Sequence, residues 1–116
     1  MSHATLDIKI RLLIDDDIAI GPGKAALLAA IDTHGSISAA ARVLGMSYRR
    51  AWTLVETMNR CFQAPLVVTS PGGRQGGGAQ LTPMGREALQ RYQSIVTLAT
   101  HAIQAETEAL AKLLKP

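Results

Sequence analysis

At 116 residues the chain has the length of one domain with a single core, and it is too short for two independent cores. Hydrophobic residues make up 47% of it and aromatic residues only 3%, a balance that favours closely packed helices over a sandwich of aromatic-rich strands. The net charge is +3, the single cysteine, Cys61, excludes an intrachain disulfide, and no signal peptide or membrane span is expected, so we predict a cytoplasmic protein.

The first predicted element is a half-buried strand over residues 6–14, where apolar residues alternate with charged ones in a period of two. Three aspartates at 15–17 then turn the chain, and residues 18–20 are expected to form a short return strand. The acidic turn is open to a second interpretation as a metal loop, but it lacks the spacing and the terminal glutamate of an EF-hand. We therefore predict an N-terminal β-hairpin or strand and no metal site.

Two helices are expected next. Residues 24–34 have apolar side chains at helical spacing, and Gly35 follows as a natural C-cap. Ser36 or Ser38 can cap a short alanine-rich helix, which Gly45 ends by adopting the left-handed conformation.

A third helix is predicted from a cap at Ser47 to about Phe62. Because the turn before it is so short, this helix must cross the preceding one steeply, which is helix-turn-helix geometry. At about 100° per residue its core face and its outer face separate cleanly. The core face holds Ala51, Leu54, Val55, Met58 and Phe62, the outer face holds Arg49, Thr53, Glu56 and Arg60, and Tyr48, Trp52 and Arg50 lie on the flanks.

A β-hairpin is predicted after this helix. Residues 66–70 are rich in β-branched side chains, and residues 79–82 can pair back onto them. The loop between them contains five glycines around Arg74 and Gln75, and we expect it to be exposed and mobile. A phosphate-binding loop of the Walker type needs Gly-Lys-Ser/Thr opening a helix, which is missing here. The hairpin is instead typical of the wing of a winged helix, which contacts the DNA backbone or the minor groove.

The remaining residues, 83–114, are predicted to form one long helix with Pro83 in its first turn. Some 30 residues at about 1.5 Å each extend about 45 Å, longer than a domain of this size is wide. We therefore expect the apolar stripe to pack on a second copy of the chain, the alternative being that it folds back over its own core. The predicted dimer contacts are Leu89, Tyr92, Val96, Ala99, Ile103 and Leu110.

Positive charge is concentrated in the middle of the sequence. Residues 35–86 contain six arginines and one acid, Glu56, so this segment carries 6 − 1 = +5 while the remainder carries −2. Such an uneven distribution favours a polyanionic partner over an ordinary solvated surface.

Four motifs at this spacing resemble a known family. They are Gly35-Ser36-Ile37-Ser38, Ser47-Tyr48-Arg49 followed by Ala51-Trp52, Glu56 with Met58-Asn59, and Gly72-Gly73 to Gly76-Gly77-Gly78-Ala79 leading into Leu81-Thr82. Together they resemble the DNA-binding domain of the ModE family of molybdate-responsive transcriptional regulators, whose winged helix is similar to the LysR type. The resemblance implies a homodimer held by long helices. It also implies that Ser47, Tyr48, Arg49, Trp52 and Thr53 belong to a recognition helix, with Arg74 in the wing.

Members of that family continue into small β-barrel domains that bind molybdate, and these 116 residues do not include them. An oxyanion effector is therefore a partner that the sequence itself does not support.

The chemistry of the side chains predicts roles for several of these residues without reference to the family. Arg49 can pair bidentately with guanine, whereas Arg60 and Arg74 are expected to neutralise phosphates. Ser36 and Ser38, with the free amides of their helix start, can hold a phosphate as that helix crosses the backbone.

Three of the candidates keep an alternative interpretation. Trp52 can be a structural side chain under the wing, and Tyr48 can pack at the edge of the core. Arg50 can form a surface ion pair with Asp32 or Glu56.

An enzyme is not expected. His3, His34 and His101 are scattered without partners at metal-ligand spacing, and no serine lies in a nucleophile elbow. We predict no catalytic residue, no metal and no cofactor.

The sequence therefore predicts a mainly helical single domain, 1–116, with helices and wing over 21–82 and a long dimerisation helix over 83–114. Its predicted function is sequence-specific binding of double-stranded DNA as a homodimeric transcriptional regulator. The alternatives are a winged-helix protein-interaction module and a DNA binder that also binds a small oxyanion. The predicted DNA-binding residues are Ser36, Ser38, Ser47, Tyr48, Arg49, Arg50, Trp52, Thr53, Arg60, Arg74 and Gln75.

Overall fold

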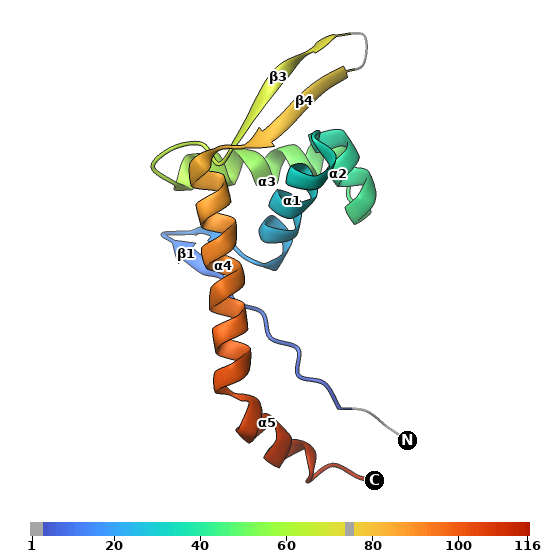
Figure 1. Cartoon of the computed structure of the whole chain (residues 1–116), viewed down its shortest axis with the longest axis vertical. Coiled ribbons are helices and arrows are strands. Elements are labelled where there is room, and N and C mark those ends of the chain that lie inside the picture. The colour runs from blue at the N-terminus through green and yellow to red at the C-terminus, as the bar shows by residue number, and fades with distance from the viewer. Residues whose placement is uncertain (1–3, 74–75) are drawn as a thin grey trace.

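The computed structural model describes residues 4–73 and 76–116 and has the predicted class, mainly helical with two small antiparallel sheets (Figure 1). No helix in this part of the chain is both long and apolar enough to cross a bilayer. In chain order the elements are β1 (Leu12–Ile14), β2 (Asp17–Ile20), α1 (Pro22–His34), α2 (Ile37–Leu44), α3 (Tyr48–Cys61), β3 (Val67–Gly73), β4 (Gly76–Leu81), α4 (Pro83–Ala102) and α5 (Gln104–Ala111).

Local sequence signals set the helix ends where they were predicted. The Ser36 hydroxyl caps α2 by accepting a hydrogen bond from the Ala39 amide at 3.0 Å, and the Ser47 hydroxyl caps α3 in the same way. Gly35 and Gly45 end α1 and α2 with φ of 75° and 68°, a left-handed conformation that other residues rarely adopt.

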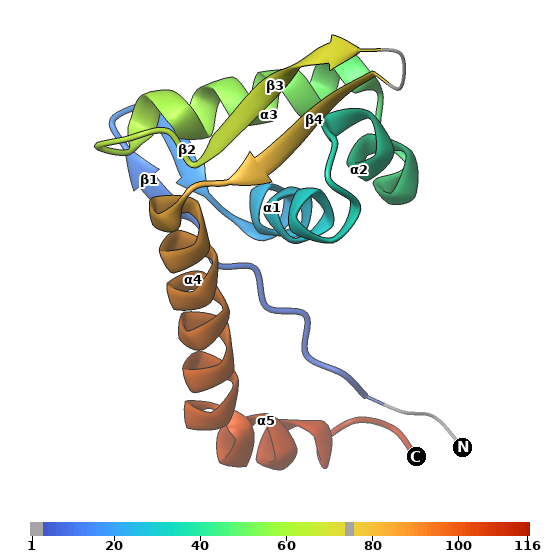
Figure 2. The same cartoon turned by 45° about the horizontal axis from the view of Figure 1, so that its top comes forward.

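The hydrophobic core lies around α1, which packs against α2, α3, β4 and the start of α4. Leu27, Leu28 and Ile31 on α1 are fully buried, together with Met58 of α3 and Leu66 at the start of the wing. Figure 2 shows α1 beneath the wing, with α3 passing behind it. The core thus holds α2, α3 and the wing in fixed relative positions.

The N-terminal hairpin differs from its prediction. Only residues 12–14 of the expected strand form β1, and they are exposed rather than half-buried. The pairing ends where Leu12 faces Ile20, because Gly21 and Pro22 turn the chain into α1 and leave earlier residues without a partner strand. The return strand β2 is confirmed.

The segment before β1 packs on α4 instead of extending the sheet. The Tyr92 hydroxyl donates a hydrogen bond to the Ile10 carbonyl at 2.8 Å. Burial of this phenol, which is only 8% exposed, raises the pKa of Tyr92.

The wing consists of β3 and β4, paired antiparallel with Val67 opposite Leu81 and Ser70 opposite Gly78. Both strands extend further into the glycine-rich segment than the sequence predicted, with ladder pairing resuming between Gly73 and Gly76. The predicted contacts Arg74 and Gln75 lie outside the described residues.

The single long C-terminal helix predicted over 83–114 is wrong in one respect. It is broken at Ile103, whose ψ of 3° separates α4 from α5. The Thr100 and Thr107 hydroxyls bond the carbonyls four residues earlier, an arrangement that weakens and bends helices. Since little of the chain's own core lies against this region, packing does not compensate for the bend.

Candidate nucleic-acid interface

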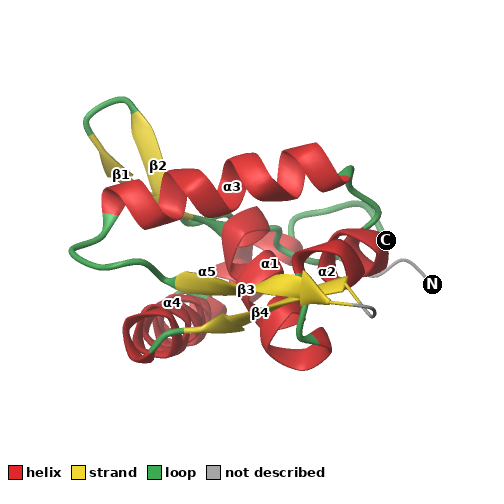
Figure 3. Cartoon of the chain, turned by 90° about the horizontal axis from the view of Figure 1, so that it is seen from above, coloured by secondary structure: helices red, strands yellow, loops and turns green. Residues whose placement is uncertain are grey.

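The first two turns of α3 present their outer face to solvent. Arg49, Arg50 and Thr53 are exposed, while Ala51 and Val55 on the opposite side are 0% and 2% exposed. The predicted division of this helix into a core face and an outer face is therefore confirmed. Seen from above, α3 and the wing run roughly parallel, with α1 and α2 between them in this view (Figure 3).

An aromatic pair forms the flank of α3 that faces the wing. The rings of Tyr48 and Trp52 meet edge to face, with centroids 6.2 Å apart and planes at 78°. Tyr48 is 55% exposed, so it is not packed into the core edge. Trp52 is half-buried and packs against the core, and it therefore supports the helix as well as lining this flank.

A hollow of about 280 Å³ lies between this aromatic flank, the start of α2 and the wing. Two of its walls are hydroxyl-rich, because serines open α2 and neighbouring hydroxyl residues lie on β3. Its lining is Ser36, Ile37, Ser38, Tyr48, Trp52, Thr69, Ser70, Gly77, Gly78 and Ala79.

The chemistry of this hollow suits an anion. The first amides of a helix have no partner within it, and the helix dipole places partial positive charge at the same end. Ser38 is exposed beside those amides, and Tyr48 carries a further hydroxyl donor. The hollow thus offers neutral donors from three elements to one bound group, which fits a phosphate of a nucleic-acid backbone.

The structure brings together four of the predicted residues here, Ser36, Ser38, Tyr48 and Trp52. Two further hydroxyl residues of the lining, Thr69 and Ser70, were not predicted. The available signal was a pair of hydroxyl residues in the strand directly before the glycine-rich loop, but only the fold places that strand against α2.

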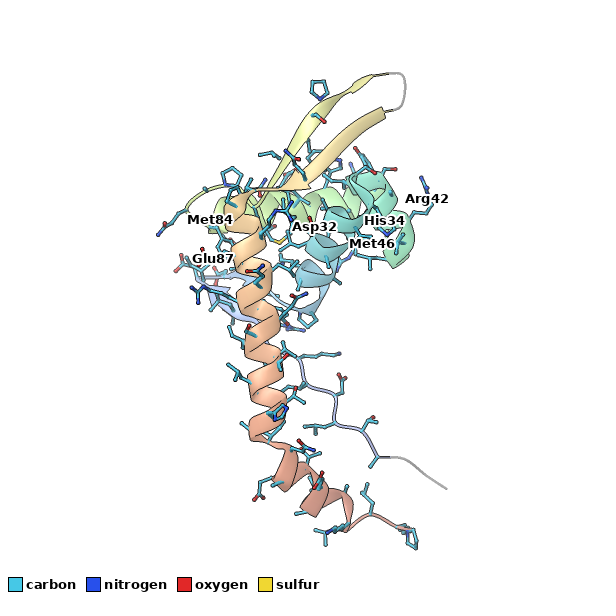
Figure 4. The ribbon with its side chains drawn as sticks, viewed as in Figure 1. Asp32, His34, Arg42, Met46, Met84 and Glu87 are labelled. Carbon is cyan, nitrogen blue, oxygen red and sulfur yellow. The ribbon has the colours of Figure 1, made fainter. Side chains whose placement is uncertain are left out.

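Two ion pairs of the structure involve residues that were discussed as candidates. Asp32, a suggested partner of Arg50, instead pairs with Arg86 at 2.8 Å, and Figure 4 shows Asp32 close to the start of α4. Arg60 pairs with Asp17 of the N-terminal hairpin at 3.6 Å. Arg60 lies in the last turn of α3, at the opposite end from Arg49, and its contact with a phosphate stays a prediction.

Two of the predicted dimer contacts are corrected as well. Leu89 and Tyr92 are each 8% exposed and belong to the chain's own core, and Val96 packs partly against that core. Ala99 and Ile103 are half-buried, and Leu110 on α5 is 63% exposed. The heptad stripe of the sequence thus faces inward along the first half of α4.

Among the residues whose burial is described, one charged side chain is buried, and it lies away from the hollow. Lys24 at the start of α1 is 9% exposed. Burial lowers the pKa of Lys24, an effect that the nearby Cys61 and Asp17 partly oppose and that Arg50 adds to. Within residues 4–73 and 76–116, no three side chains of metal-ligand type gather at one place.

Comparison with known proteins identifies what the chain is similar to. Residues 24–86 match the model of the bacterial regulatory helix-turn-helix proteins of the lysR family. The molybdenum-pterin-binding protein MopB of Rhodobacter capsulatus is 51% identical over 76 residues, which are 66% of this chain and 28% of that protein.

Two relatives named ModE match more of the chain. The molybdenum transport protein ModE of Azotobacter vinelandii is 40% identical over 102 residues, covering 86% of this chain and 38% of that protein. The transcriptional regulator ModE of Yersinia pestis is 38% identical over 98 residues, covering 84% and 35% respectively. The chain therefore spans well under half the length of these relatives, and the predicted resemblance to ModE is confirmed.

Proposed function

The chain belongs to the lysR family of bacterial regulatory helix-turn-helix proteins, and on this premise we propose that it binds double-stranded DNA and regulates transcription from the cytoplasm. One observation carries the proposal: the exposed start of α3 and the hydroxyl-lined hollow lie side by side, at the two positions that a base contact and a backbone contact require. The name of the Yersinia pestis relative, a transcriptional regulator, agrees with this role.

In the proposed complex the first turns of α3 enter a major groove. Arg49 on the outer face pairs bidentately with the O6 and N7 atoms of a guanine, and Thr53 one turn later contacts the next base. The Thr53 hydroxyl donates to the Arg49 carbonyl at 3.1 Å, so its oxygen lone pairs are available to a donor on the DNA. Arg50 and Ser47 flank this contact and reach the neighbouring backbone.

The hollow holds the adjoining phosphate. The phosphate oxygens accept hydrogen bonds from the amides at the start of α2 and from the hydroxyls of Ser38, Tyr48 and Thr69. These bonds replace water around the phosphate. The backbone contact fixes the register of α3 in the groove, and it carries no sequence information of its own.

A titration of random duplex DNA at several salt concentrations tests DNA binding. Because bound phosphates release counterions, we expect the association constant to fall by at least about tenfold between 50 and 200 mM salt. If the protein does not bind duplex DNA at low salt but does bind an acidic protein, the alternative of a protein-interaction module would be favoured.

The names of the relatives also link them to molybdenum. By extension we propose that the genes regulated here serve molybdenum uptake or use. Binding of molybdate to this chain is not part of the proposal. Calorimetry with molybdate addresses the oxyanion alternative, and we expect no heat of binding.

We further propose that the protein acts as a homodimer through the outer side of α4. Ile95 and Leu98 are 50% and 69% exposed there, and they border an open groove of about 860 Å³ along the helix. A two-fold pair would present two α3 helices to half-sites about one helical turn of DNA apart, or a small multiple of it.

Leu98→Asp should weaken this dimer. In the dimer the new carboxylate would be buried among apolar side chains, without water or a partner charge, which costs free energy. We therefore expect the dissociation constant of the dimer to rise by about tenfold or more. The matched control is Thr100→Asp, which adds the same charge to an exposed position about 160° around α4 from Leu98 and outside the groove. Sedimentation equilibrium measures both variants, and an unchanged dissociation constant for Leu98→Asp would place the interface elsewhere.

A further inference from the structure

In the described part of the chain, one side chain hydrogen-bonds the start of the wing to α3. The Asn59 side-chain oxygen accepts hydrogen bonds from the amides of Leu66 and Val67 at 2.8 and 3.2 Å, and its side-chain nitrogen donates to the Val67 carbonyl at 3.1 Å. Leu66 and Val67 are 0% and 3% exposed. All three bonds are partly buried, and such bonds are stronger and harder to replace than exposed ones.

The wing has a second attachment near its middle. The Ala79 amide of β4 donates to the Gly35 carbonyl at the end of α1, at 2.8 Å. The backbone approaches closely here, because a Cβ atom on Gly78 would lie 2.9 Å from the Ser70 hydroxyl oxygen and 3.6 Å from the Gly35 carbonyl oxygen. The wing is thus held at its base by α3 and at its middle by the turn between α1 and α2.

The base of the wing also has a support that does not involve α3. Thr82, the N-cap of α4, donates its hydroxyl to the Pro65 carbonyl at 2.7 Å and its amide to the Leu66 carbonyl at 2.9 Å. Without Asn59 the strand would therefore stay attached to α4 while losing its fixed angle to α3.

We propose that Asn59 is a positioning residue for DNA binding, which sets the angle of the wing over α3 and thereby the width of the hydroxyl-lined hollow. Asn59 lies seven residues after Trp52, about 10 Å further along the helix, so it acts through β3 and not by touching DNA. Thr69 and Ser70 follow Val67 on the same strand and carry the wing side of the hollow. This inference rests on the proposed DNA-binding function.

Asn59→Ala tests the proposal in a chain whose only cysteine is replaced by Cys61→Ser. Spin labels at Glu56→Cys on α3 and Val68→Cys on β3, both exposed positions, report the distance between helix and wing. We expect a broadened distance distribution and about tenfold weaker binding of duplex DNA, measured at a temperature where the variant is folded.

The control variant is Ile20→Val, a mild core change in β2, which packs on α1 and α3. It should lower the melting temperature while leaving both the label distances and the DNA affinity unchanged. A broadened distribution or equal loss of affinity in this control would assign the effect of Asn59 to general stability.

Asn59→Asp serves if the alanine variant does not fold. It keeps the acceptor for both amides but turns a second oxygen toward the Val67 carbonyl, so the distance between the labels should increase. Unchanged label distances in both Asn59 variants would overturn the proposal. If the parent protein binds no DNA, the proposed function fails, and the label distances still report whether Asn59 sets the wing.

Discussion

Gly85→Ala should destabilise the protein by about 3 kcal/mol or more, because the new methyl group has no space. A Cβ atom at this position would lie 2.1 Å from the Leu66 carbonyl oxygen and 3.0 Å from its carbonyl carbon. These are backbone atoms of a fully buried residue, and the same carbonyl accepts the amide hydrogen bond of Thr82. The start of α4 and the base of the wing would have to move apart, which would break the contact that attaches the wing to α4.

Gly23→Ala is the matched control. A Cβ atom there meets nothing within 4 Å, and the residue lies in α1 with no positive φ. Alanine in a helix is favoured over glycine by about 0.5–1 kcal/mol, so this variant should be equally or more stable. Urea unfolding followed by circular dichroism compares the two variants, and equal midpoints would contradict the close packing of α4 on the wing.

Arg49→Ala should cost about 1–3 kcal/mol of binding to a preferred DNA sequence, a loss of roughly 5- to 150-fold, and much less on random DNA. The reason is that the variant removes a base contact on the exposed face of α3 while the hollow beside it is unchanged. Fluorescence anisotropy at one salt concentration measures both affinities, using a sequence selected from a random library.

The control for Arg49 is Arg11→Ala. It removes the same charge from an exposed position in the segment before β1, away from α3 and from the groove along α4. Its effect should be small and equal on both DNAs. If Arg49→Ala weakens both DNAs equally, Arg49 contacts a phosphate and another residue reads the sequence.

Much of the fold was predictable because its signals are local. The capping serines at 36 and 47 and the left-handed glycines at 35 and 45 follow from short-range backbone chemistry, and each lies where the sequence predicted it. The faces of α3 follow from helical periodicity. The arrangement of α2, α3 and wing was predicted both from the order of these elements and from the resemblance to ModE.

The features that were missed depend on contacts between distant segments. A heptad stripe shows that one side of α4 is covered, but not by which chain, and Tyr92 is in fact covered by its own core and the Ile10 carbonyl. Residues 6–11 of the strand predicted over 6–14 have no strand to pair with, because β2 ends at Ile20, opposite Leu12. The hollow is formed by α2, α3 and the wing. The sequence alone therefore does not show that Thr69 and Ser70 line it, because this depends on how the wing packs near α2.

The central claim is that duplex DNA contacts the start of α3 and the hollow beside it. Amide chemical-shift changes during titration of the ¹⁵N-labelled protein with a short duplex test this claim most directly. We predict that the largest changes map to residues 36–38, 47–53 and 69–70, with little change on α5. Changes confined to the outer side of α4 and the N-terminal hairpin, with residues 47–53 unaffected, would contradict the account.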